Sequence, residues 1–220
     1  MTASVEPVMP HCMNVKIKNC GLKTPEAIDQ SIITGAHFVG FVHCEKSPRH
    51  VTIEQMGTLI KHTNGRVKTV AVLVDPSDET LDAINHARPD YIQLHDVSNI
   101  ARIEAIAERY HKPIITALSL RSPEDITFAN TLAEISAHVL FDAKSPGSGQ
   151  PFDWKLLSHT QLHHPWFLAG GLTVENVAEA IRATGAPMVD VSSGIEDSPG
   201  NKSLEKIAAF NHAVLHAAHG

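Results

Sequence analysis

Eight short runs of apolar and β-branched residues recur along this sequence, and their repetition restricts the fold more than any other feature. Near-continuous hydrophobicity, rather than strict alternation, is typical of strands that helices cover on both faces. Between the runs, apolar residues fall at intervals of three and four, as they do in amphipathic helices. The predicted strands are residues 14–19, 38–42, 68–74, 91–94, 113–118, 138–142, 166–170 and 188–192.

Helix starts are marked by capping signals between several of these runs. Thr24, Ser77 and Ser122 each stand before a helical segment and offer a side-chain oxygen to the unpaired amides of the first turn. The last segment is predicted to be a helix from an apolar stripe at Leu204, Ile207, Ala208, Leu215 and Ala218.

Eight β-then-α units predict an α/β fold, a (β/α)8 TIM barrel, with an open doubly wound sheet as the main alternative. We expect one barrel domain over residues 1–220, because no linker, low-complexity tract or shift in composition marks a second domain. Residues 1–13 are expected to form a loosely ordered N-terminal extension.

Composition excludes several classes of protein. With 43% hydrophobic and 19% charged residues, the chain has the make-up of a globular protein. No apolar run approaches the roughly 18 residues of a membrane span, and the N-terminus lacks a signal-peptide pattern, so a cytoplasmic location without membrane contact is expected. Three cysteines without a CxxC motif argue against a disulfide framework.

Charge and histidine content argue against nucleic acid and metal ions as ligands. The formal net charge of -6 comes from interspersed acids and bases, which disfavours nucleic-acid binding and requires that any anionic ligand be held locally. The 15 histidines include no HExxH motif and no pairing with cysteine at zinc-site spacing, so no metal site is predicted.

In a barrel of this kind, the loops after the carboxyl ends of the strands carry the chemistry. Cys20 and Gly21 follow the first strand, and Lys18 shares a strand face with Cys20. If both side chains face the barrel interior, the Lys18 ammonium favours a thiolate and lowers the pKa of Cys20, which makes the thiol a candidate nucleophile or general base. The alternative, a small buried hydrophobic side chain, is equally compatible with this position.

Two further strand ends carry charged candidates. Arg49, in the turn after the second strand, can hold a carboxylate with its bidentate fork, although such a turn can also be merely solvated. Asp142 closes the sixth strand, where partial burial would let it donate a proton; a capping role is the alternative. The glycine-rich stretch after it, residues 143–154, is interpreted as a flap or a flexible loop.

The last two strands end in glycine-rich turns that suit a phosphate group. Gly170 and Gly171 follow the seventh strand, and the stretch from Asp190 to Gly194 follows the eighth. Backbone amides in these two loops commonly bind phosphate in barrels, which accommodates an anion in an acidic protein. Together the strand ends predict proton transfer on a phosphorylated substrate that carries a carboxylate.

From about Val15 to Ile207 the sequence resembles the phosphoribosylanthranilate isomerase family of tryptophan biosynthesis. The motifs that carry the resemblance occur in the family's order: "KNCGLKTPE", "GFVHCEKSPRHV", "QLHD", "LFDAK", "GSGQPFDW", "LAGGL", "VDVSSGIE" and "PGNKSLEKI". The resemblance implies a cofactor-independent aldose-ketose isomerase that converts N-(5-phosphoribosyl)anthranilate to 1-(2-carboxyphenylamino)-1-deoxyribulose 5-phosphate. It also implies a monomer or homodimer.

The same resemblance assigns roles by position. It implies that Asp142 is the general acid that opens the ribose ring, that Cys20 is the general base that removes the C2 proton, and that Arg49 holds the anthranilate carboxylate. Asp190 would contact a ribose hydroxyl or order its loop. The phosphate would be surrounded by Gly170, Gly171, Ser193 and Gly194.

Some positions depart from the family pattern, and three other functions are possible for a barrel of this kind. Asn19 replaces an aliphatic residue, residues 43–45 replace aromatic residues and proline, and Asp96 stands where glycine is common. A phosphosugar epimerase would show metal-ligating His and Asp residues at strand ends, and an indoleglycerol phosphate synthase would show catalytic lysine and glutamate residues on early strands. Neither set is evident in this sequence. A catalytically inactive barrel used for binding would have lost the thiol or the acid, and this sequence retains both.

Overall fold

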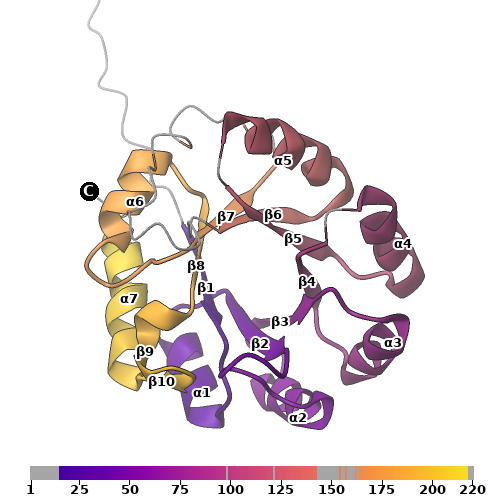
Figure 1. Cartoon of the computed structure of the whole chain (residues 1–220). Helices are drawn as coiled ribbons and strands as arrows, with labels where there is room; N and C mark the ends of the chain where they lie inside the picture. Colours follow the sequence, from indigo (N-terminus) through magenta and orange to yellow (C-terminus); the bar gives the residue numbers. More distant parts are fainter. Residues whose placement is uncertain are drawn as a thin grey trace, which may run out of the picture.

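Eight parallel strands form a closed barrel with helices around it (Figure 1). The computed structural model describes residues 15–97, 99–120, 122–142, 154, 157, 162 and 164–217. The barrel strands are β1 (Lys16–Cys20), β2 (Phe38–His43), β3 (Lys68–Val74), β4 (Tyr91–His95), β5 (Ile114–Ser119), β6 (His138–Asp142), β7 (Trp166–Ala169) and β8 (Met188–Val191).

The helices lie outside the strands and alternate with them along the chain (Figure 1). Within the described ranges they are α1 (Pro25–Ile33), α2 (Ile53–Thr63), α3 (Asp78–Ala87), α4 (Ile100–Tyr110), α5 (Pro123–Ile135), α6 (Val177–Thr184) and α7 (Leu204–Ala217). The β-then-α alternation predicted from the sequence is therefore confirmed for seven of the eight strands, and the connection from β6 to β7 falls mostly outside the described residues.

Closure of the sheet decides between the two predicted architectures. β8 pairs with β1 in parallel, with Lys16 opposite Met188 and Asn19 opposite Val191. An open doubly wound sheet has two edge strands, whereas each of these eight strands is paired on both sides, so the predicted TIM barrel is confirmed and its alternative is wrong. The assignment of residues 1–220 to one domain stays a prediction, and the extension at 1–13 lies outside the described residues.

Alternate residues of each strand enter two separate apolar cores. One fills the barrel itself and is formed by Cys20, Phe38, Val70, Val72, Ile115, Leu140, Phe167, Ala169 and Met188. The other lies between the strands and the helices, and includes Ile17, Val39, Leu94 and Phe141. Because side chains of a strand alternate between faces, both neighbours of a residue in the barrel core point to the helices. Both faces are therefore apolar, as the near-continuous runs predicted.

The predicted caps at Thr24 and Ser77 are confirmed, and the predicted stripe on the last helix is confirmed only in part. Thr24 accepts a hydrogen bond from the amide of Ala27, and Ser77 accepts one from Thr80. Leu204, predicted to begin the stripe of α7, is 42% exposed. Ile207 is buried as predicted, together with Phe210, Asn211 and Val214, which were not predicted, and Leu215 is half-buried against the same core.

A small hairpin after β8 was not predicted. Ser193–Ile195 forms a 3-10 turn, and it leads into two short antiparallel strands, β9 (Glu196–Ser198) and β10 (Asn201–Lys202). The hairpin lies beside α1 and α7 at one side of the barrel (Figure 1). It brings Glu196 and Lys202 to the end of the barrel where the strands point.

Asn19, the departure next to the candidate thiol, is fully buried on the helix-facing side of β1. Its Nδ2 donates to Ser31 Oγ at 3.0 Å, and Ser31 Oγ donates to the carbonyl of Ala27. Asn19 Oδ1 finds no partner among the described residues. A polar link between β1 and α1 thus replaces an aliphatic contact.

Removing both ends of this link should stabilise the protein relative to removing one. Ser31→Ala leaves the buried Asn19 amide without its acceptor and should lower the free energy of unfolding by about 1–3 kcal/mol. Asn19→Val combined with Ser31→Ala removes the buried polar pair and should recover that loss. Urea unfolding of the two variants and wild type measures the difference; a double variant less stable than Ser31→Ala would contradict the argument.

Candidate active site

All the described candidate residues lie at the end of the barrel where the strands terminate. Cys20 and Asp142 are the last residues of β1 and β6, and Gly170 directly follows β7. Asp190 lies within β8, next to its last residue. This is the end at which barrels of this class carry their chemistry.

Cys20 and Lys18 point into the barrel and lie against the same residue of β2. A Cβ added to Gly40 would come within 2.9 Å of Cys20 Sγ and 3.4 Å of Lys18 Nζ. Gly40 therefore leaves the space that the thiol and the ammonium occupy. Cys20 is 6% exposed and Lys18 is fully buried, so the predicted inward orientation of both side chains is confirmed.

The predicted lowering of the Cys20 pKa is wrong in its net direction. Burial raises the pKa of this thiol, and the Asp190 carboxylate raises it further. Lys18 and Lys202 attract the thiolate and lower the pKa, but they do not outweigh the burial. The thiol form is therefore favoured at neutral pH in the protein without substrate.

Lys18 and Asp190 form a buried ion pair across the β1–β8 junction. Lys18 Nζ donates to Asp190 Oδ1 at 2.9 Å, and the two residues stand opposite each other in the strand register. Burial disfavours the charged lysine, yet the charges of Asp190 and Cys20 raise the pKa of Lys18 overall. Asp190 also interacts electrostatically with Asp142, so it couples the β1 side of the site to the β6 side.

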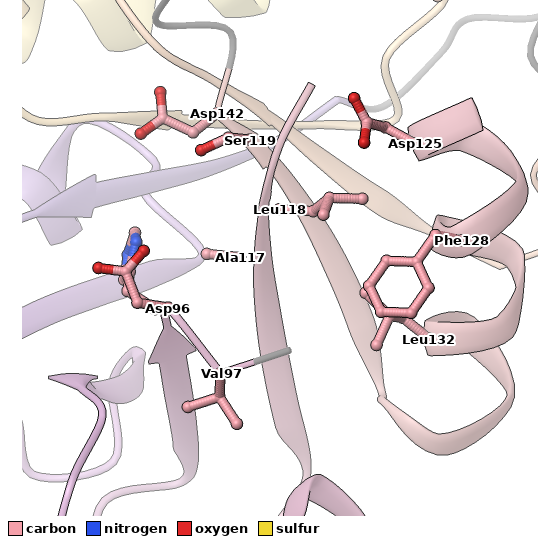
Figure 2. Close-up of a pocket in the computed structure, with 10 residues that line it drawn as sticks. Asp96, Val97, Ala117, Leu118, Ser119, Asp125, Phe128, Leu132 and Asp142 are labelled. Carbon is pink, nitrogen blue, oxygen red and sulfur yellow. The ribbon is translucent and has the colours of Figure 1, made fainter. Parts of the chain in front are cut away.

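Asp142 lines a pocket of about 370 Å³ at the ends of β4, β5 and β6. Figure 2 shows its carboxylate beside Ser119, with Asp96 facing the same space, while Leu118, Phe128 and Leu132 lie on the side of α5.

His95 shares the pocket with Asp142, and Gln93 holds its ring by donating from Nε2 to His95 Nε2 at 2.7 Å. Burial and the charge of Lys18 lower the pKa of His95, so the imidazole in this pocket is neutral.

Arg49 already holds a carboxylate, that of Glu196 in the hairpin. Its Nε donates to Glu196 Oε1 at 2.7 Å and its Nη2 to Oε2 at 2.8 Å. The stem of Arg49 crosses directly over Gly21, where an added Cβ would lie 2.7 Å from Arg49 Cδ. Gly21 has a φ of 77°, a conformation that favours glycine, and it places the arginine next to Cys20.

The two glycine-rich loops predicted to bind phosphate are in contact. Gly170 and Gly171 have φ values of 88° and 70°, which glycine adopts without strain. A Cβ on Gly194 would overlap the carbonyl oxygen of Leu172, so the loop after β8 packs directly on the loop after β7. Gly171 and Ser193 are exposed, and their backbone is therefore accessible to a ligand.

Residues 143–153, interpreted from the sequence as a flap or loop, lie outside the described residues. Among the residues that are described, no three His, Cys, Asp or Glu side chains are grouped to hold a metal ion. Nor does any helix of this part of the chain have the length and hydropathy to cross a membrane.

Sequence reasoning missed Gly40, Glu196 and Lys202. Gly40 stood inside a strand, where an isolated glycine indicates close approach of another group. Glu196 and Lys202 lie in the motifs "VDVSSGIE" and "PGNKSLEKI", which were noted for their resemblance without a role for either residue.

Comparison with known proteins identifies relatives along nearly the whole chain. The model of the family described as N-(5'phosphoribosyl)anthranilate (PRA) isomerase matches residues 17–213. A protein of Parvibaculum lavamentivorans named N-(5'-phosphoribosyl)anthranilate isomerase is 43% identical over 215 residues, which cover 93% of this chain and 100% of the relative.

Solved structures agree with the sequence relatives. Phosphoribosyl anthranilate isomerase from Thermotoga maritima superimposes with a TM-score of 0.81 at 34% identity, covering 89% of this chain and 96% of that one. A complex of such an enzyme with reduced 1-(o-carboxyphenylamino)-1-deoxyribulose 5-phosphate gives a TM-score of 0.80 at 31% identity, covering 90% and 97%.

The charge state of Cys20 is open to direct titration. In a protein whose only thiol is Cys20, made by Cys12→Ser and Cys44→Ser, the ultraviolet absorbance of the thiolate should rise only at pH values above the ordinary value of 9.0, because burial raises the pKa. The same protein with Cys20→Ser supplies the baseline. A titration complete well below pH 9 would show that Lys18 outweighs burial.

Proposed function

This chain belongs to the N-(5'-phosphoribosyl)anthranilate isomerase family, and on that premise we propose that it catalyses an Amadori rearrangement in tryptophan biosynthesis. The substrate is N-(5-phosphoribosyl)anthranilate and the product is 1-(2-carboxyphenylamino)-1-deoxyribulose 5-phosphate. The observation that supports this best is the meeting of an acid, a thiol, an arginine and two glycine loops at one end of the barrel. A cytoplasmic location stays a prediction.

In the proposed reaction, Asp142 is the general acid. It gives a proton to the ribose ring oxygen, the bond between this oxygen and C1 breaks, and a cationic imine forms at C1. The pocket that Asp142 lines supports this role, because it opens directly beside the carboxyl group.

Cys20 is the proposed general base. Its thiolate takes the proton from C2, the electrons of the C–H bond neutralise the imine, and the resulting enolamine tautomerises to the ketone. Since burial keeps the free thiol protonated, we propose that the thiolate forms in the substrate complex, with the thiol proton released to solvent. There the cationic imine adds to the attraction of Lys18 and Lys202, which both lower the pKa of Cys20.

The two ends of the substrate would be held by different means. Backbone amides of Gly170, Gly171, Ser193 and Gly194 are proposed to bind the phosphate, and Arg49 is proposed to bind the anthranilate carboxylate. Asp190 is held by Lys18 and interacts electrostatically with both Cys20 and Asp142. This central position supports the proposed contact of Asp190 with a ribose hydroxyl. The substrate imine itself serves as the electron sink, so this chemistry uses no cofactor.

Loss of either proton-transferring group should abolish most of the turnover. The decay of the fluorescence of freshly made phosphoribosylanthranilate should accelerate with the wild-type protein, and Cys20→Ala and Asp142→Asn should each lower kcat roughly 100-fold or more. Lys61→Gln, an exposed position in α2 on the outside of the barrel, is a control expected to keep its activity. Wild-type protein without any acceleration would refute the function, whereas an active Cys20→Ala would refute only the base.

Inorganic phosphate should compete with the substrate if the two glycine loops bind its phosphate group. We expect added phosphate to raise the apparent KM and to leave kcat unchanged, because it occupies a binding subsite without touching the reacting atoms. Chloride at the same ionic strength is the control for screening. An unchanged KM at high phosphate concentration would contradict the assignment of the loops.

A further inference from the structure

Arg49 uses only one edge of its guanidinium for the bond to Glu196. The edge formed by Nε and Nη2 is occupied, while Nη1 has no hydrogen-bond partner in the part of the chain that the structure describes. The side chain of Arg49 is 23% exposed and that of Glu196 is 5% exposed. A second carboxylate can therefore reach the arginine from solvent without displacing the first.

Glu196 is held in place by a second cation. Lys202 Nζ donates to Glu196 Oε1 at 2.7 Å and to the carbonyl of Ser192 at 2.9 Å. Burial raises the pKa of Glu196, but hydrogen bonds from Arg49 and Lys202 outweigh it and the net pKa is lowered. One anion between two cations leaves a net positive charge, so Glu196 does not prevent binding of an anion beside Arg49.

The same network reaches the backbone of the candidate base. Ser192 Oγ donates to the carbonyl oxygen of Cys20 at 3.2 Å. The turn of the hairpin also braces the loop that carries Arg49, because a Cβ on Gly200 would overlap the carbonyl oxygen of Pro48. Arg49 is thus fixed from the hairpin on one side and packed over Gly21 on the other.

We propose that Glu196 is a positioning residue for recognition of the substrate carboxylate: it holds one edge of Arg49 so that the other edge is preorganised for the anthranilate group. This proposal rests on the proposed function, since it takes Arg49 as the carboxylate-binding residue. A preorganised guanidinium loses less conformational freedom when the substrate binds, and the substrate therefore binds more tightly. Glu196 need not touch the substrate.

The test compares Glu196→Gln with Asp197→Asn on two substrates. Asp197 is the neighbouring acid of the same hairpin, 57% exposed and paired with Lys206, so its variant is the matched control. Glu196→Gln should raise the KM for phosphoribosylanthranilate roughly tenfold and change kcat by less than about twofold, because it weakens uniform binding. With the phosphoribosyl adduct of aniline, which lacks the carboxylate, the variant should match wild type.

Binding provides a readout that does not depend on turnover. In calorimetry, the reduced product analogue should bind Glu196→Gln more weakly than it binds wild type. The reduced analogue made from aniline, which lacks the carboxylate, should bind the variant and wild type equally. Arg49→Met combined with Glu196→Gln should bind no more weakly than Arg49→Met alone. Glu196→Asp, which keeps the charge but shortens the reach, should weaken carboxylate recognition in the same direction and is the second variant if Glu196→Gln does not fold.

The two proposals fail in different ways. A wild-type protein that binds the analogues but does not isomerise the substrate refutes the function, and the calorimetry still tests Glu196. The positioning role is refuted if Glu196→Gln loses equal affinity for the ligands with and without the carboxylate. It is also refuted if the KM and the affinity do not change.

Discussion

The buried ion pair between Lys18 and Asp190 is the interaction on which the barrel and its site both depend. It joins the first and last strands of the barrel, 172 positions apart in the sequence, at the seam that closes the sheet. Removing one partner of such a pair leaves an uncompensated buried charge, which costs about 3–5 kcal/mol. The pair also sets the field at Cys20, because one of its charges lowers the pKa of the thiol and the other raises it. Closure of the fold and tuning of the base therefore share one contact.

Most of the fold could be predicted from the sequence because its determinants are local. The run at 68–74 matched β3 in full, and the predicted ends of the other strands fell within two residues of the observed ones. Closure could not be deduced, since only pairing of β1 with β8 distinguishes a barrel from an open sheet. The hairpin was missed because "EDS" and "NK" are too short and polar to show a strand pattern. On α7 the stripe was predicted correctly at Ile207 and Leu215 but not at Leu204, which the packing of the helix leaves 42% exposed.

The candidate site could be predicted as a set of positions but not as a set of charges. Knowing that chemistry lies at strand ends was enough to select Cys20 and Asp142. The direction of the Cys20 pKa was wrong because it is a balance between burial and three neighbouring charges, and burial is a property of the folded chain. The partner of Arg49 was also hidden, since Glu196 lies 147 positions further along the sequence.

The segment after β8 connects the two proposed anchors of the substrate. Ser193 and Gly194, proposed to bind phosphate, are followed within two residues by Glu196, which holds Arg49. The segment is fixed at both ends, by the packing of Gly194 against Leu172 and by the contact of Gly200 with Pro48. In the proposed function, this short stretch of backbone would set the distance between the phosphate subsite and the carboxylate subsite. A substrate with both anions at the matching separation would be stretched across the mouth of the barrel, with its reacting carbons over Cys20. Two local anion subsites, as proposed, would let an acidic protein bind a highly anionic substrate without a basic surface.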